Sequence, residues 1–403
     1  MRLSSIPPWS EQAARACAIA LGFSIPISVA LDNVLLVLIL IFWLAALNRD
    51  KLMQISRNRV ALAALALFAL FVAGLSYGTR EPGDGLRYLG KYADLAFVPI
   101  FVTLFNTERA RCYAWYALAA SMVLTLALSY LLWAGLVEYG DLIGDNPLVP
   151  AVFKRYLTQN VMMAFAAFLF VYLGRSARSP ALRYTWLSLA VLAVANVALL
   201  IPGRTGQVIL VALMVYLAYS LWRWKGALLI MSIIAVLIAM GGVNHRLGQI
   251  FSEWKAWQPG EITVTGTGER LEFFQNSFNI ALAHPLIGSG TGSFPRVYAD
   301  HVKGSAIKPT DNPHNEYLNT AVQLGIVGLL ALLYLLYCEW RQAATLPTAY
   351  DVQLARGLVI TFVIGCLLNS LLMDHVEGLF FAWISGVLFA GLRLPQPSAA
   401  SIA

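Results

Sequence analysis

Charged residues are scarce in this sequence: Asp, Glu, Lys and Arg make up only 12% of its 403 residues, whereas 59% of the residues are hydrophobic. A soluble domain carries roughly 25% charged residues, so this composition excludes an ordinary soluble fold. It is typical of a protein whose helices face lipid. We therefore predict an all-α polytopic membrane protein in which residues 1–403 form a single integral membrane domain.

Cysteine is also rare, with 4 residues in the whole chain. None is predicted in an external loop, so no disulfide framework is expected. The N-terminus lacks a small-residue cleavage site after its first apolar run, which predicts a retained span rather than a cleaved signal peptide. No basic patch with interleaved aromatic residues is present, and nucleic acid is therefore not an expected partner.

Long apolar runs provide about 12 candidate transmembrane helices, each close to the roughly 20 residues that cross a hydrocarbon core. They are predicted near residues 14–30, 32–47, 59–76, 92–106, 112–136, 157–173, 184–201, 207–222, 226–241, 317–338, 357–373 and 379–392.

Basic residues set the predicted orientation of these spans. They crowd short loops such as 49–59 and 175–183, which predicts that these loops and both termini are cytoplasmic. Residues 242–316 then form one large external loop. Within it, apolar residues recur at helical spacing between Thr267 and Leu282, which predicts an amphipathic helix lying on the membrane surface.

The segment Asp311–Leu318 places polar groups where this loop enters a span. Ionisable groups at a membrane boundary are costly to desolvate, so they favour a site over packing. His314 follows Pro313, and a histidine with its ordinary pKa of about 6.5 can exchange a proton near neutral pH. A structural histidine is the alternative. His301, His314, Asp300 and Asp311 match no common metal-binding spacing, and we predict no metal site.

Two external arginines are candidates for binding an anion. Arg204 follows Pro202-Gly203 at a predicted helix start, where free backbone N–H groups favour negative charge. It could equally be a snorkelling residue that anchors the helix end. Arg270 lies at the edge of the apolar stripe of the loop helix; alternatively, it pairs with Glu269 or Glu272 on the helix surface.

Further basic residues lie in the other predicted external loops: Arg80, Arg87, Lys91, Lys154 and Arg155. Each could bind lipid head groups without specificity. Taken together with the two arginines, they predict a cationic, water-facing pocket at the external membrane surface. Guanidinium groups bind phosphate oxygens in bidentate fashion, so such a pocket suits a lipid-linked diphosphate. The reaction class this suggests is glycosyl transfer from a polyprenyl diphosphate, with a histidine as base.

The chain resembles the bacterial O-antigen ligases, within the wider O-antigen ligase and polymerase family. The matching pieces, between about residues 200 and 330, are Gly203-Arg-Thr-Gly206, Gly268-Glu-Arg270 leading into Asn276-Ser277, His284-Pro-Leu-Ile-Gly-Ser-Gly290, and His314-Asn-Glu-Tyr-Leu318 with Gly325 and Gly328. The individual pieces are short. Their order, with one large external loop before the last three spans, is more specific.

The resemblance implies a fold related to the GT-C glycosyltransferases and a site on the periplasmic face of the bacterial inner membrane. It implies metal-independent transfer of polysaccharide from undecaprenyl diphosphate-linked O-antigen to the lipid A-core, among membrane lipids and without a nucleotide or other cofactor. His314, Arg204 and Arg270 match the essential residues of the family. Thr205, Asn315 and Tyr317, beside them, are expected to contact substrate. Direct attack at the anomeric carbon would invert its configuration.

Other functions remain open at this stage. An O-antigen polymerase would use the same donor with a glycan acceptor, but such chains tend to have two large external loops, and here residues 137–156 are short. An oligosaccharyltransferase acting on protein is a further option, although those chains are usually longer. A transporter or flippase would place polar residues along a path near the bilayer midplane, whereas here the ionisable residues gather at the surfaces.

Overall fold

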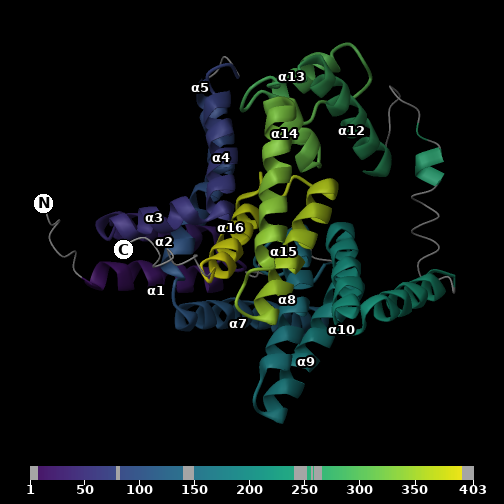
Figure 1. Cartoon of the computed structure of the whole chain (residues 1–403). Helices are drawn as coiled ribbons and strands as arrows, with labels where there is room; N and C mark the ends of the chain where they lie inside the picture. The colour runs from purple at the N-terminus through teal and green to yellow at the C-terminus, as the bar shows by residue number, and fades with distance from the viewer. Residues whose placement is uncertain are drawn as a thin grey trace, which may run out of the picture.

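The computed structural model describes residues 8–78, 82–138, 149–239, 252–255, 257 and 266–392. Every regular element within these residues is a helix (Figure 1). The main helices are α1 (Pro8–Ser24), α2 (Val29–Ala45), α3 (Arg49–Arg57), α4 (Arg59–Gly74), α5 (Pro82–Lys91), α6 (Val98–Leu104), α7 (Glu108–Trp133), α8 (Tyr156–Ser176), α9 (Pro180–Ala195), α10 (Arg204–Ala239), α12 (Gly266–Ala283), α13 (Phe294–His301), α14 (Glu316–Ala343), α15 (Ala349–Leu368) and α16 (His375–Phe389).

Within the described residues, 6 helices are long and apolar enough to cross a membrane, or up to 7 if a pair of helices bent by 115° counts as one span. They are Glu108–Trp133, Tyr156–Ser176, Pro180–Leu200, Arg204–Ser232, Glu316–Ala343 and Ala349–Leu368, with Val29–Ala45 and Arg49–Arg57 as the bent pair. These helices support a polytopic, all-helical membrane protein.

Among the described residues, the predicted number of about 12 spans is not reached, because apolar runs of similar length fold in different ways. The run predicted at 92–106 divides into the short helix Ala93–Phe97 and α6. The runs at 207–222 and 226–241 join in α10, with non-helical backbone at Trp222 and Arg223. In Figure 1 the second part of α10 turns away from the bundle. A hydropathy pattern shows where the apolar runs lie, but it does not predict where a helix bends or breaks.

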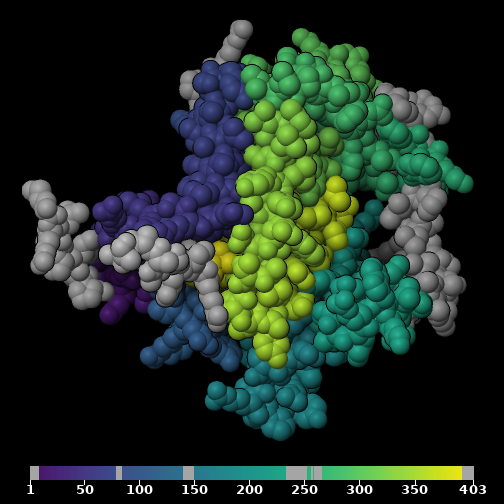
Figure 2. Space-filling model, viewed as in Figure 1, coloured from purple at the N-terminus to yellow at the C-terminus, as the bar shows by residue number. Residues whose placement is uncertain are grey.

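The long helix α14 organises the end of the molecule that contains the candidate site. It runs down the face seen in Figure 2, with α4 on one side and the α12–α13 region over its upper part. The helix is broken at Gly325, where φ is +63° and ψ is −157°. A break of this kind frees backbone N–H and C=O groups, which must find other partners.

The glycine-rich segment after α12 supplies these partners. Ser289 and Gly290 donate their N–H groups to the carbonyls of Val322 and Gln323, both at 2.8 Å, and Ile326 donates to the carbonyl of Pro285 at 2.8 Å. Thr291 continues the contact by donating to the carbonyl of Gly74 in α4 at 3.0 Å. The segment Gly288–Ser293 is therefore packed between α4 and α14 and is hydrogen-bonded to both helices.

We expect Gly325→Ala to destabilise this end of the protein. A side chain there would hold left-handed backbone, and its Cβ would lie 2.4 Å from the backbone of Leu286. The expected loss is about 2 kcal/mol or more of unfolding free energy, measured as a lowered thermal midpoint in detergent. Gly90→Ala in α5, where a Cβ meets nothing within 4 Å, is the matched control and should not lower the midpoint. Equal midpoints for both variants would contradict this account of the break.

Candidate active site

The start of α14 fixes the position of His314. Asn315 caps the helix by accepting a hydrogen bond from the N–H of Leu318 at 3.0 Å, and its amide donates to the carbonyl of Leu367 in α15 at 3.1 Å. His314 itself has a φ of +53°, an uncommon conformation for a side-chain-bearing residue. Its N–H donates to Oδ1 of Asn312 at 2.8 Å, which supports this tight turn. Strained backbone of this kind is often found at functional positions.

The imidazole of His314 is oriented by two neighbours. Its Nδ1 lies 3.0 Å from Oδ1 of Asn369, in the segment between α15 and α16. Because an amide oxygen can only accept, Nδ1 carries the hydrogen in this arrangement, and Nε2 is the basic nitrogen. Phe273 of α12 stacks on the ring, with centroids 6.2 Å apart. The geometry thus leaves one ring nitrogen able to accept a proton from a substrate.

Arg204 is held by close packing between α8 and the start of α10. The Asn160 side chain donates to the carbonyls of Ile201 and Gly203, at 3.2 and 2.8 Å. A Cβ at Gly203 or Gly206 would lie 2.3 or 2.7 Å from Asn160, so both positions require glycine. The two glycines of the Gly-Arg-Thr-Gly motif therefore allow this contact, and Arg204 projects beside it with its side chain exposed.

Arg270 and Arg204 lie near each other although they belong to different helices. Arg204 Nη1 donates to Oγ1 of Thr267, at 3.3 Å, one turn before Arg270 in α12. Burial, and then the like charge of Arg204, lower the pKa of Arg270, while Tyr156 opposes this shift. Two neighbouring guanidinium groups at a partly buried position repel each other, and an anion between them would relieve that repulsion.

Asp374, which the sequence analysis did not single out, connects His314 with two of the other basic residues. Burial raises the pKa of this carboxyl group, and the nearby charges of Lys91, His314 and Arg155 oppose the increase. These residues come from α5, the start of α8, the start of α14 and the segment before α16. Arg155 is next to Tyr156, which interacts with Arg270. The five basic residues Lys91, Arg155, Arg204, Arg270 and His314 therefore gather at one end of the spanning helices.

Asn369 and Asp374 could have been noticed in the sequence, because the polar pairs Asn369-Ser370 and Asp374-His375 interrupt an otherwise apolar region. The apolar run predicts one continuous span over 357–373, but α15 ends at Leu368. Glu316 anchors the segment that follows: its Oε2 accepts hydrogen bonds from the N–H groups of Leu372 and Met373, at 2.9 and 3.2 Å. The buried Glu316 carboxyl group thus helps to position Asp374.

Several predicted substrate-binding residues have partners within the protein. Besides the cap made by Asn315, the hydroxyl of Tyr317 donates to the carbonyl of Val363 at 3.0 Å, and Thr205 is buried at the start of α10. The contacts of Asn315 and Tyr317 connect the start of α14 to α15, and substrate contact by these two residues and Thr205 stays a prediction. Arg87 is exposed on α5, one turn before Lys91. Arg80 lies outside the described residues.

Lys154 is buried against α2, whereas its neighbour Arg155 is exposed. Its Nζ lies 3.8 Å from Oδ2 of Asp32, which is completely buried. We expect Lys154→Met to cost about 3–5 kcal/mol of unfolding free energy, because it leaves a buried carboxylate without its cation. Adding Asp32→Leu should recover part of that loss, because the charge of Lys154 also acts on the buried Glu377. Chemical denaturation in detergent would measure both variants, and a double variant no more stable than the single one would refute this pairing.

Comparison with known proteins gives one family match. Residues 189–333 match the family described as O-antigen ligase. This stretch contains Arg204, Arg270 and His314, whereas Lys91, Arg155 and Asp374 lie outside it. No curated protein matches the chain significantly.

Among solved structures, the chain is similar to one from a study described as "Structural coordination of polymerization and crosslinking by a peptidoglycan synthase complex". The two chains are 16% identical, the alignment covers 82% of this chain and 95% of the other, and the TM-score is 0.49. This similarity is too distant to support a functional argument. The family match over residues 189–333 confirms the resemblance to the O-antigen ligase and polymerase family that the sequence motifs predicted.

Proposed function

We propose that this protein is an O-antigen ligase of the bacterial inner membrane, with both termini in the cytoplasm and its site on the periplasmic face. The donor would be O-antigen polysaccharide on undecaprenyl diphosphate, and the acceptor a sugar of the lipid A-core. The observation that carries the proposal is the gathering of Arg204, Arg270, Arg155 and Lys91 around His314 at one end of the spanning helices. The family match over the segment containing three of these residues supports it.

In the proposed reaction, His314 Nε2 takes the proton from the acceptor hydroxyl. The acceptor oxygen forms a bond to the anomeric carbon of the donor sugar, and the bond from that carbon to the phosphate oxygen breaks. Undecaprenyl diphosphate leaves with the electron pair, and a single displacement inverts the anomeric carbon. Arg204 and Arg270 would stabilise the negative charge that develops on the departing phosphate, as preorganised donors do in other transfer enzymes.

The remaining charged residues complete the proposed donor site. Arg155 and Lys91 would contact the diphosphate from the side of α5 and α8, with Arg87 further out. Before the donor binds, the carboxylate of Asp374 would balance the positive charge of these residues. When the donor binds, Arg155 and Lys91 would contact the diphosphate in place of Asp374. A site in which cations outnumber carboxylates suits a doubly charged leaving group.

A polymerase that extends the donor glycan would use the same donor site and the same base. The short 137–156 segment favours the ligase, because polymerases of this family tend to have a second large external loop. The difference lies in the acceptor, which only an assay can identify.

The test is transfer in vitro in the presence of EDTA, with purified protein, undecaprenyl diphosphate-linked O-antigen and lipid A-core. Glycosylated core from the wild type but not from Arg204→Ala would support a metal-independent ligase with this site. Lengthening of the donor glycan with no modification of the core would identify a polymerase instead. Full activity of Arg204→Ala would exclude the proposed donor site.

A further inference from the structure

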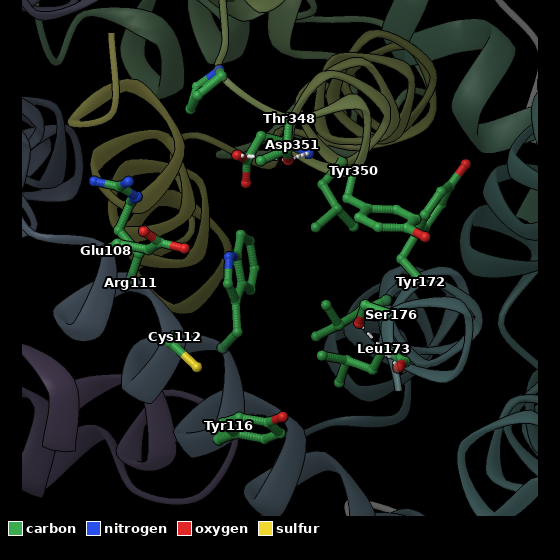
Figure 3. A pocket seen from close by; sticks show the side chains of 14 residues that line it. Glu108, Arg111, Cys112, Tyr116, Tyr172, Leu173, Ser176, Thr348, Tyr350 and Asp351 are labelled. Atoms are coloured by element: carbon green, nitrogen blue, oxygen red, sulfur yellow. Dashed lines mark hydrogen bonds between the residues drawn. The ribbon is translucent and has the colours of Figure 1, made fainter. Parts of the chain in front are cut away.

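A cavity lies at the other end of the helix bundle, between the start of α7, the end of α8 and the start of α15 (Figure 3). Its volume is about 290 Å³. In Figure 3, Glu108 and Arg111 lie together on one side, Tyr172 and Tyr350 lie on the other, and Thr348 and Asp351 lie above them. None of the residues placed in the candidate active site lines this cavity.

Two helices connect the cavity with the candidate active site. Helix α8 begins beside Arg155 and ends at Ser176, which lines the cavity. Helix α15 begins at the cavity and ends near Leu367, the residue bonded to Asn315. With a rise of 1.5 Å per residue, helices of about 20 residues separate the two places by roughly 30 Å. The cavity is therefore at the opposite membrane surface, at the level of the lipid head groups.

The lining carries charges of both signs. Arg111 uses Nη1 to donate to the carbonyl of Phe105 at 3.2 Å, and a guanidinium has further N–H groups for a phosphate. Glu108 and Asp351 supply two carboxylates to the lining. Asp351 also accepts from the hydroxyl of Thr348 at 2.8 Å, which fixes its position. A lining with one guanidinium and two carboxylates disfavours a purely anionic ligand and suits one that carries both a phosphate and a cation.

Aromatic side chains form much of the remaining wall: Trp115, Tyr116, Tyr172 and Tyr350. The faces of such rings attract cations, and their amphipathic character is typical of residues at the membrane surface. Leu169 and Leu173 continue the wall along α8 towards the membrane interior, where acyl chains would lie.

We propose that this cavity binds the head group of a phospholipid that carries a phosphate and a primary ammonium, as phosphatidylethanolamine does. Arg111 contacts the phosphate, while Glu108, Asp351 and the tyrosine rings contact the ammonium. The proposal rests on the cavity and on the spanning helices, and it is independent of the transfer reaction proposed above.

Cys112 provides a direct probe, because it lines the cavity and is exposed. Of the other cysteines, Cys338 and Cys366 are buried and Cys17 is half-buried, so a Cys17→Ser background makes labelling specific. Full-length protein would be placed in nanodiscs of either phosphatidylethanolamine or phosphatidylglycerol and treated with a maleimide. We expect slower labelling of Cys112 in phosphatidylethanolamine, and equal rates in the two lipids would overturn the proposal. Protection by inorganic phosphate alone, in phosphatidylglycerol discs, would also overturn it by identifying a simple phosphate site.

A pair of arginine variants separates this site from general attraction to lipid. Arg111→Gln removes the phosphate contact, whereas Arg109→Gln removes an arginine that stacks on Tyr113 and lies outside the cavity. By native mass spectrometry we expect Arg111→Gln to retain roughly tenfold less phosphatidylethanolamine than Arg109→Gln, the loss of one charge-assisted contact. Equal retention by the two variants would refute the site. Unfolding curves for both variants would show whether Arg111→Gln is folded. If Arg111→Gln does not fold, Glu108→Gln provides a second test, because it is expected to weaken the preference for phosphatidylethanolamine over phosphatidylglycerol.

Discussion

Replacing His314 by asparagine is expected to lower the transfer rate by about 10²–10⁴-fold, the usual contribution of a general base. Asparagine is the informative choice because it tolerates the left-handed backbone that His314 adopts at φ +53°. The cap made by Asn315 is then preserved, so the loss can be attributed to the missing imidazole. Initial rates of core glycosylation at saturating donor would measure it.

The matched control for this variant is His301→Asn, at an exposed position on α13. It should transfer glycan at the wild-type rate. Thermal midpoints for both variants show whether the fold is intact. A His314→Asn protein that folds normally and keeps more than about a tenth of the wild-type rate would remove this histidine from the role of general base.

Replacing Arg270 by lysine is expected to slow transfer by about 10²–10³-fold, even though the positive charge is kept. Lysine presents a single ammonium group, whereas the guanidinium can hold two phosphate oxygens in fixed geometry. Because the charge on the leaving phosphate grows towards the transition state, the effect should be larger on kcat than on the KM for the donor. Steady-state kinetics with varied donor concentration would separate these two quantities.

Arg296→Lys is the corresponding control, an exposed arginine on the neighbouring helix α13. Its kinetic constants should match those of the wild type. If Arg270→Lys raised only the KM, Arg270 would bind donor and transition state equally, and the proposed role in stabilising the leaving group would be wrong.

Much of the candidate site could be predicted from the sequence because its residues belong to short local motifs. A histidine before a helix cap, an arginine between two glycines and an arginine on the loop helix each combine a polar group with a nearby chain break. The helix predicted around Thr267–Leu282 corresponds to α12 (Gly266–Ala283). Its orientation depends on packing: Glu272, Asn276 and Ser277 are buried towards the protein, while Phe278 and Leu282 on the apolar stripe are exposed.

Composition and periodicity along the chain are sufficient to predict the membrane class, the all-helical character and the set of candidate cations. Which of these cations lie close together depends on how the helices pack. Lys154 and Arg155 are neighbours in the sequence, yet one is buried against Asp32 and the other interacts with Asp374. Asp374 and Asn369 join the site from some 60 residues beyond His314. Contacts of this kind depend on how the helices bend, as at Gly325, and on how they pack. They join residues that are far apart in the sequence, so the local pattern of residues does not predict them.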